Sequence, residues 1–313
     1  MDMAAEKLNS LRNNLHEHFA GKESIIDDLL ICILSDGHVL MEDVPGVGKT
    51  TLARILARSI DCDFGRIQFT PDTLPGDVTG SSVYNMKTGE FTYREGAIMH
   101  QIILADEINR TSPRTQASLL EAMAEGQVSV DGKTYPLPQP FMVIATQNPV
   151  EFMGTYPLPE AQMDRFMMRL SIGYPDETEE IRLAKNFLAG KTVNDAASVL
   201  GTEDIINMKE AVKKVHVSDG VISYIRDIIR LTREENSFVT GASPRAMLML
   251  IRSSQAHAYI NEREFVKPDD VKAVAVNVLH HRLSLTPEAK IRKEDTDRIL
   301  KELILKARIP TGT

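Results

Sequence analysis

The stretch 43–50, which reads Asp-Val-Pro-Gly-Val-Gly-Lys-Thr, constrains this chain more than any other feature of its sequence. It follows the apolar run Val-Leu-Met at 39–41 and precedes a segment in which Leu52, Ile55 and Leu56 recur at helical spacing. A strand, a glycine-rich loop and a helix in this order are the context that a phosphate-binding P-loop needs. An ordinary glycine turn would lack this combination, so we predict a phosphate site here.

The residue types of this loop suit a polyphosphate. Gly46 and Gly48 would let the backbone wrap an oxyanion with its N–H groups pointing inward, where the positive end of the following helix dipole adds to the attraction. Lys49 could reach the β- and γ-phosphates, and the Thr50 hydroxyl could ligate Mg²⁺. We therefore expect the nucleotide to contact Pro45, Gly46, Val47, Gly48, Lys49, Thr50 and Thr51.

Asp43 departs from the strict motif, which has glycine at that place. The position begins the loop and would not contact phosphate. We therefore expect the departure to cost little.

Two adjacent acids, Asp106 and Glu107, end the apolar run at 102–105. In a parallel sheet, ligands bind at the carboxyl ends of the strands, so these acids should emerge beside the P-loop. Asp106 would hold Mg²⁺ through the water shell of the ion, and Glu107 would orient and polarise an attacking water. An isolated apolar run ending in two acids is more often a strand meeting solvent, but its position about 60 residues after a P-loop favours the hydrolytic interpretation.

The chain after these acids carries a helix, a hairpin and a further strand. Ser112-Pro113 begins the helix and Gly126 ends it, and Asp131-Gly132 between β-forming residues predicts the hairpin. The strand at 141–146 leads to Asn148, whose amide could hold the attacking water, although an Asn before a Pro is more often turn chemistry.

The two halves of the chain differ in pattern. The first alternates short β-rich runs with amphipathic stretches, which predicts an α/β parallel sheet with helices on both faces. From about Tyr174 the pattern is nearly all helical, which predicts a small all-helical domain. Expected strands are 39–41, 66–69, 101–105 and 141–146, and expected helices begin after Ser218, at Ser243-Pro244, at Pro268 and at Thr296.

Composition excludes several classes of protein. The 313 residues suffice for two domains, and the 42% apolar and 26% charged residues are typical of a globular chain. The absence of a long apolar run and of a signal-like start predicts a cytoplasmic protein without membrane insertion. Cys32 and Cys62 have no spacing that favours a disulfide scaffold or a zinc site. The formal charge of −8 argues against a nucleic-acid partner, although a local basic strip could still line a pore.

Taken together, these motifs resemble those of the MoxR family of AAA+ ATPases, over nearly the whole chain. The resemblance is carried by 42–50, by Ala-Asp-Glu-Ile-Asn-Arg at 105–110, by Thr-Gln-Asn-Pro at 146–149 and by 157–166, which ends in Asp164-Arg165-Phe166. It implies an AAA+ domain over 1–173 and a helical lid over 174–313. It further implies a helix-2 insert over about 75–95 and a second hairpin over about 127–140, both facing the pore or the top of a ring. The alternative is that both hairpins are exposed without a partner.

The resemblance also implies roles for three further residues. Asn148 would be sensor 1, Arg165 the arginine finger that reaches a neighbour's nucleotide, and Arg245 sensor 2. A planar, permanently charged guanidinium suits the transition state of phosphoryl transfer, although each arginine alone could equally form a surface salt bridge. Whether Arg245 acts on its own ATP or on a neighbour's stays open at this point.

The function implied by the resemblance is an ATP-driven chaperone that uses ATP and Mg²⁺. It would work as a homo-oligomeric ring, expected to be a hexamer, on a separate protein partner of the kind that carries a von Willebrand factor A domain. A nucleic-acid-translocating motor is the alternative, which salt-sensitive binding to single-stranded DNA would favour. A GTP switch is disfavoured because Thr146-Gln147-Asn148-Pro149 is not a guanine signature.

Overall fold

The computed structural model describes residues 2–148 and 154–309, and its centre is a sheet of five parallel strands. The order β2-β5-β8-β1-β9 places β1 between β8 and β9. The strands are β1 (Val39–Glu42), β2 (Phe64–Gln68), β5 (Ile102–Asp106), β8 (Met142–Gln147) and β9 (Met168–Leu170). The predicted α/β parallel sheet is therefore confirmed, and β9 is a short strand that the sequence pattern did not reveal.

The sheet separates two apolar cores, because successive strand side chains point to opposite faces. In β5, Ile102 and Leu104 belong to one core, whereas Ile103 and Ala105 belong to the other. The first core takes in α2 (Glu23–Leu34) and α3 (Lys49–Ser59), and the second takes in α5 (Pro113–Glu125). Helices thus cover both faces, as the near-continuous apolar strands require.

Two helices precede β1, and the sequence pattern did not predict them individually. They are α1 (Asp2–His18) and α2, and both bury apolar residues in the first core. Between the sheet strands lie the short helices α4 (Pro75–Thr79), η1 (Ile108–Arg110) and α6 (Glu160–Met163). Helix α5 begins after Ser112, whose hydroxyl accepts a hydrogen bond from Thr115 N, and ends at Gly126 in a left-handed conformation, as predicted.

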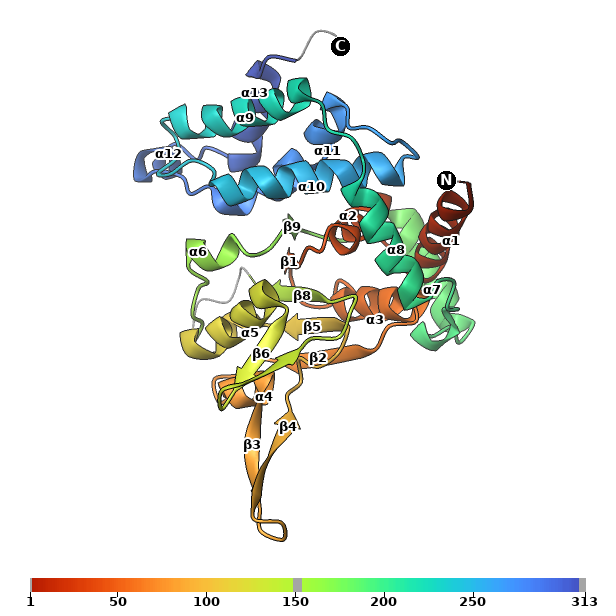
Figure 1. Cartoon of the computed structure of the whole chain (residues 1–313). Helices are drawn as coiled ribbons and strands as arrows, with labels where there is room; N and C mark the ends of the chain where they lie inside the picture. Colours follow the sequence, from red (N-terminus) through yellow and green to blue (C-terminus); the bar gives the residue numbers. More distant parts are fainter. Residues whose placement is uncertain (1, 149–153, 310–313) are drawn as a thin grey trace.

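Each of the two places that predict a hairpin forms one. Strands β3 (Gly80–Asn85) and β4 (Glu90–Glu95) pair antiparallel, as do β6 (Gln127–Val130) and β7 (Lys133–Pro136). Figure 1 shows β3 and β4 extending from the body, at the end opposite to helices α9 to α13. The rings of Tyr93 and Tyr135 stack with centroids 3.9 Å apart, which ties the two hairpins together near their base.

The second half is helical, as expected. Its elements are α7 (Glu177–Leu188), η2 (Val193–Asp195), α8 (Thr202–Lys213), α9 (Asp219–Glu234), α10 (Pro244–Ile260), α11 (Pro268–Leu279), η3 (His280–Arg282), α12 (Pro287–Ile291) and α13 (Thr296–Lys306). Ser218 and Ser243 cap α9 and α10 by accepting from Val221 N and Ala246 N, so these two predicted starts are confirmed. The predicted starts at Pro268 and Thr296 are confirmed as well.

The helical half shares its core with the sheet. Buried residues of α8, α9, α10 and α11 belong to the same cluster as those of α2 and α3. Lys7 of α1 forms an ion pair of 2.7 Å with Asp204 of α8, across the same boundary. Motion of the lid relative to the sheet would therefore disturb a continuous apolar contact. Among the helices within 2–148 and 154–309, none combines the length and apolar character needed to cross a bilayer.

Candidate active site

The P-loop adopts the backbone that its glycines allow. Gly46 and Gly48 have φ values of 88° and 93°, which side chains other than glycine rarely adopt, and α3 begins directly afterwards at Lys49. A side-chain carbon added at Gly46 would meet no atom within 4 Å, so the space before this backbone is open. The loop therefore presents its amides and the start of a helix to an accessible cavity, which is what an anion site needs.

The Lys49 ammonium lies inside this loop. Its Nζ donates to the backbone oxygen of Asp43 at 2.9 Å. Partial burial lowers the pKa of Lys49, and the carboxylates of Asp43, Asp106 and Glu107 oppose that shift. The carboxylates thus favour the protonated form of the partly desolvated ammonium, which can then donate to an incoming phosphate.

Asp43 has a structural task that explains its departure from the strict motif. Its buried carboxylate accepts from Ser171 Oγ at 2.8 Å, from Ile172 N at 2.8 Å and from Gly173 N at 3.0 Å. It thereby ties the start of the P-loop to the chain that follows β9. A glycine could not make these bonds, so in this chain the acid holds the loop in place.

The two acids at the end of β5 point to different places because the backbone turns between them. Asp106 ends the strand, and Glu107 has a left-handed φ of 59°, a conformation that costs a non-glycine residue about 1–3 kcal/mol. Thr146 of the neighbouring strand β8 forms hydrogen bonds with both residues. Its hydroxyl donates to Asp106 Oδ1 at 2.6 Å and accepts from Glu107 N at 2.9 Å. The threonine therefore fixes the turn that separates the two carboxylates.

Strand β2 contributes two polar side chains that the sequence analysis did not identify. Arg66 Nη2 lies 2.6 Å from Asp106 Oδ2, and Gln68 Nε2 donates to Glu107 Oε2 at 2.8 Å. Arg110 also lies close to Glu107, with Nε 3.3 Å from Oε2. Arg66 and Gln68 are two residues apart on one strand and share a face, but only knowledge that β2 lies beside β5 would have revealed their role.

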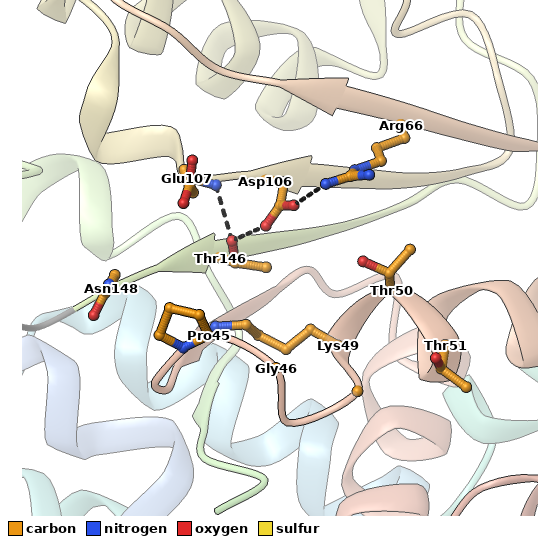
Figure 2. Close-up of a pocket in the computed structure, with 11 residues that line it drawn as sticks. Pro45, Gly46, Lys49, Thr50, Thr51, Arg66, Asp106, Glu107, Thr146 and Asn148 are labelled. Atoms are coloured by element: carbon orange, nitrogen blue, oxygen red, sulfur yellow. Dashed lines mark hydrogen bonds and ion pairs between the residues drawn. The ribbon is translucent and has the colours of Figure 1, made fainter.

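These elements enclose a pocket of about 370 Å³, shown in Figure 2. Strand ends that carry Asp106, Glu107 and Thr146 lie on one side of it, and the P-loop lies on the other. The pocket is lined by Pro45, Gly46, Gly48, Lys49, Thr50, Thr51, Arg66, Asp106, Glu107, Thr146 and Asn148. Most residues predicted for nucleotide and metal are therefore brought together. Val47 instead packs its side chain against the first apolar core, and Pro149 lies outside the described residues.

Arg165 and Arg245 do not line this pocket. Arg165 Nη1 donates to the backbone oxygen of Leu120 at 2.7 Å, and Arg245 is exposed in the first turn of α10. Ser243, which caps α10, donates to the two carboxylate oxygens of Asp164 at 3.3 and 3.2 Å. The start of α10 is thus bonded to the residue that precedes Arg165.

The pocket has the hydrogen-bond donors and the metal ligands that a nucleoside triphosphate with Mg²⁺ requires. Backbone amides and Lys49 face one part of it, and the hydroxyl of Thr50 and the carboxylate of Asp106 offer the hard oxygen ligands that Mg²⁺ prefers. Glu107 is a second carboxylate within the same cavity. Phosphoryl transfer to water needs this combination, so fold and site together define a P-loop nucleotide hydrolase.

Comparison with known proteins agrees with this chemistry. Residues 38–168 match the model of the ATPase family associated with various cellular activities (AAA), and residues 230–303 match that of the AAA lid domain. An uncharacterized protein of Bacillus subtilis, YeaC, is 48% identical over 97% of each chain. Chaperone MoxR1 of Mycobacterium tuberculosis is 38% identical over 93% of this chain and 79% of its own.

A solved structure supports the fold as well. It is a crystal structure of a protein from Cytophaga hutchinsonii proposed to be an ATPase, with a TM-score of 0.91 and 38% identity over 99% of this chain and 96% of its own. The fold and the site are those of an AAA+ ATPase. Within that class, the chain belongs to the MoxR family, whose namesake from Paracoccus denitrificans is 31% identical over 88% of this chain and 87% of its own.

Proposed function

We propose that this AAA+ ATPase hydrolyses MgATP in the pocket between the P-loop and the end of β5, and that hydrolysis drives the remodelling of partner proteins. The observation that carries the catalytic part is the left-handed backbone of Glu107. With this backbone, the Glu107 carboxylate lies in the same cavity as Lys49 and Thr50, whereas Asp106 is the last residue of β5. A second carboxylate beside a phosphate cradle, in addition to the one assigned to Mg²⁺, is the group that can activate water.

Each residue then has a defined role. The amides of 46–50 and Lys49 bind the phosphates, and Thr50 and Asp106 hold Mg²⁺, which when bound would neutralise charge on the β- and γ-phosphate oxygens. Glu107 accepts a proton from the attacking water, and the Asn148 amide orients that water. Gln68 and Arg110 both contact Oε2 of Glu107, and we propose that these contacts orient the carboxylate toward the water.

We further propose that Arg165 and Arg245 both act on the ATP of a neighbouring subunit in a homo-oligomeric ring. Two observations support this proposal. Among the described residues, neither arginine lines the nucleotide pocket of its own chain. In addition, Ser243 at the start of α10 bonds to Asp164, which precedes Arg165. Two arginines on segments that are bonded to each other could together reach the phosphates of the next subunit. A ring of six, with the sheet domain at 1–173 and the lid at 174–313, is the arrangement we propose.

The remodelling role is supported by the name of one relative, a chaperone, and by the exposed tip of the β3–β4 hairpin. Tyr84, Met86 and Phe91 are exposed there, with Met86 91% exposed. Exposed apolar side chains at the end of a projecting hairpin suit contact with another protein. The partner would be a separate chain, of the kind that carries a von Willebrand factor A domain, and the reaction would take place in the cytoplasm, where ATP is available.

Replacing Glu107 by Gln tests the catalytic part. Glu107→Gln keeps the size of the side chain but removes its basicity, so ATP binding should persist while kcat falls by about 10²–10⁴-fold. Binding of a fluorescent ATP analogue and phosphate release would be measured on the same preparation. Hydrolysis close to that of the wild type would refute the role of Glu107.

Mixing variants tests the shared site. Arg165→Ala and Lys49→Ala should each be inactive, but a mixture should regain activity, because an intact P-loop then meets an intact Arg165 from its neighbour. Loss of rescue in mixtures that still co-assemble would mean that Arg165 acts within its own chain.

For remodelling, Glu107→Gln with ATP should retain a partner in a pull-down, and adding Met86→Ser and Phe91→Ser should release it. Equal retention would contradict the hairpin's role.

A further inference from the structure

Arg282, in η3 of the helical half, is buried against the segment that carries Arg165. Its side chain is 2% exposed, and its Nε forms an ion pair of 2.7 Å with Asp164 Oδ1. A fully buried arginine is costly unless it is paired and its remaining donors are bonded. The other N–H donors of this guanidinium therefore need hydrogen-bond acceptors.

Both terminal nitrogens of Arg282 bond to the backbone on either side of Arg165, and within the lid they also contact the oxygen of Val278, His281 Nε2 and Met249 Sδ. Nη2 donates to the oxygen of Asp164 at 3.3 Å and to the oxygen of Phe166, and Nη1 donates to the oxygen of Met167 at 3.3 Å. The adjacent His281 also reaches the Phe166 oxygen, from Nε2 at 3.1 Å. Residues 164, 166 and 167 are thus all held by one lid guanidinium, with Arg165 between them.

We propose that Arg282 is the positioning residue for Arg165: it holds the backbone that presents the arginine finger and makes the finger respond to the lid. This inference rests on the proposed role of Arg165 at a neighbour's ATP. Arg282 does not touch the nucleotide and acts only through the segment it binds. The same contacts give the lid a direct mechanical connection to the next subunit's active site.

The chemistry of the side chain explains why arginine occupies this position. Its planar fork can bond a carboxylate and several carbonyl oxygens at fixed angles, whereas a lysine ammonium is a compact charge on a flexible stem. Ser243, the cap of α10, bonds to the same Asp164 carboxylate. A change in the lid would therefore reach Asp164 from two places, and both would shift Arg165 together with the start of the helix that carries Arg245.

The test uses Arg282→Lys, which keeps a positive charge beside Asp164 but cannot form the several guanidinium hydrogen bonds to the backbone oxygens of 164, 166 and 167. A displacement of about 1 Å at a catalytic group can reduce the rate about 100-fold, so we expect kcat to fall 10- to 100-fold with nucleotide affinity unchanged. Arg263→Lys is the matched control, since Arg263 also pairs with a buried lid carboxylate, Asp270, but contacts no part of 164–167. Its ATPase activity should stay at the wild-type level, whatever its effect on the melting temperature.

Subunit mixing separates positioning from a general structural effect. Arg282→Lys mixed with Lys49→Ala should regain activity, because an intact finger then serves an intact P-loop, whereas Arg282→Lys mixed with Arg165→Ala should not. The double variant Arg165→Ala with Arg282→Lys should be no slower than Arg165→Ala alone. Full activity of Arg282→Lys, or no rescue by Lys49→Ala, would overturn the proposal.

These outcomes are distinguishable from a failure of the proposed function. If Arg165→Ala is itself not rescued by Lys49→Ala, the shared site is wrong. If Arg165→Ala is rescued and Arg282→Lys is not, only the positioning role of Arg282 is wrong. A variant Arg282→Met with Asp164→Asn, which leaves no buried unpaired charge, provides the same comparison should Arg282→Lys fold poorly.

Discussion

Arg66 and Asp106 form an ion pair on neighbouring strands, with 2.6 Å between Arg66 Nη2 and Asp106 Oδ2. Asp106 is the carboxylate that we assign to Mg²⁺, so the guanidinium occupies part of the coordination space of a metal ligand. The second oxygen of Asp106 accepts from Thr146, which leaves the carboxylate satisfied on both sides (Figure 2). A hydrated Mg²⁺ would compete with Arg66 for this carboxylate, so we expect metal binding to loosen the ion pair.

Arg66→Ala should lower the Mg²⁺ concentration that half-saturates ATPase activity. Arg66 is 48% exposed, and exposed ion pairs contribute about 0.2–1 kcal/mol, so the expected decrease is at most about fivefold. Phosphate release would be followed across a Mg²⁺ titration at saturating ATP, with Arg298→Ala on α13 as the control. A higher Mg²⁺ requirement would show instead that Arg66 assists the nucleotide.

Thr146→Val should reduce both stability and turnover. The valine has the same shape but can neither accept from Glu107 N nor donate to Asp106, and each of these part-buried hydrogen bonds contributes about 0.5–1.5 kcal/mol. The turn that separates the two carboxylates would loosen, so kcat should fall roughly tenfold. Urea unfolding and steady-state kinetics measure the two effects, and Thr146→Ser should preserve both quantities. Equal values for Val and Ser would disprove the role of the hydroxyl.

Gly96→Ala should destabilise the base of the β3–β4 hairpin. A side-chain carbon at Gly96 would lie 2.2 Å from Gly80 N and 2.3 Å from Val78 O, and neither backbone atom can move aside easily. Overpacking of this kind costs about 1–3 kcal/mol. Limited proteolysis should show faster cleavage within 80–95. Gly76→Ala, whose added carbon would lie 3.7 Å from Ser81, is the control and should be cleaved like the wild type.

Asp28→Asn should stabilise the protein increasingly as the pH rises. Burial raises the pKa of Asp28 from 3.8 to about 7, Asp27 adds to the rise, and His257 and Asn277 oppose it. The folded chain therefore binds a proton that the unfolded chain has released between about pH 4 and pH 7, so the cost of ionising Asp28 is absent below this window and complete above it.

The measurement compares Asp28→Asn with the wild type by urea unfolding at pH 5 and pH 8. The difference in unfolding free energy should grow by a few kcal/mol, on the order of 1.4 kcal/mol for each pH unit within the window. Asn277 donates to the Asp28 carboxylate, and an amide oxygen can still accept that bond. Glu302→Gln, an exposed residue of α13, is the control, and a pH-independent difference for Asp28→Asn would contradict the prediction.

The sequence alone predicted the part of the candidate site that is local in the chain. A P-loop is a contiguous strand, loop and helix, so Gly46, Gly48, Lys49 and Thr50 could be assigned from their order, and Asp106 and Glu107 from the apolar run before them. Helix starts at Ser218 and Ser243 were equally predictable, because a capping hydroxyl bonds to an amide only three residues away. The resemblance to MoxR proteins added the identity of the family.

Only the tertiary structure decided which distant side chains meet. Arg66 reaches Asp106, and Thr146 reaches both acids, because β2 and β8 lie on either side of β5, an order that no local pattern encodes. In the same way, Asp43 meets the chain after β9, and Arg282 meets the segment around Arg165 across 118 positions of sequence. Through-space contacts of this kind depend on the packing of whole elements, so the residues that hold the catalytic groups became visible only in the folded chain.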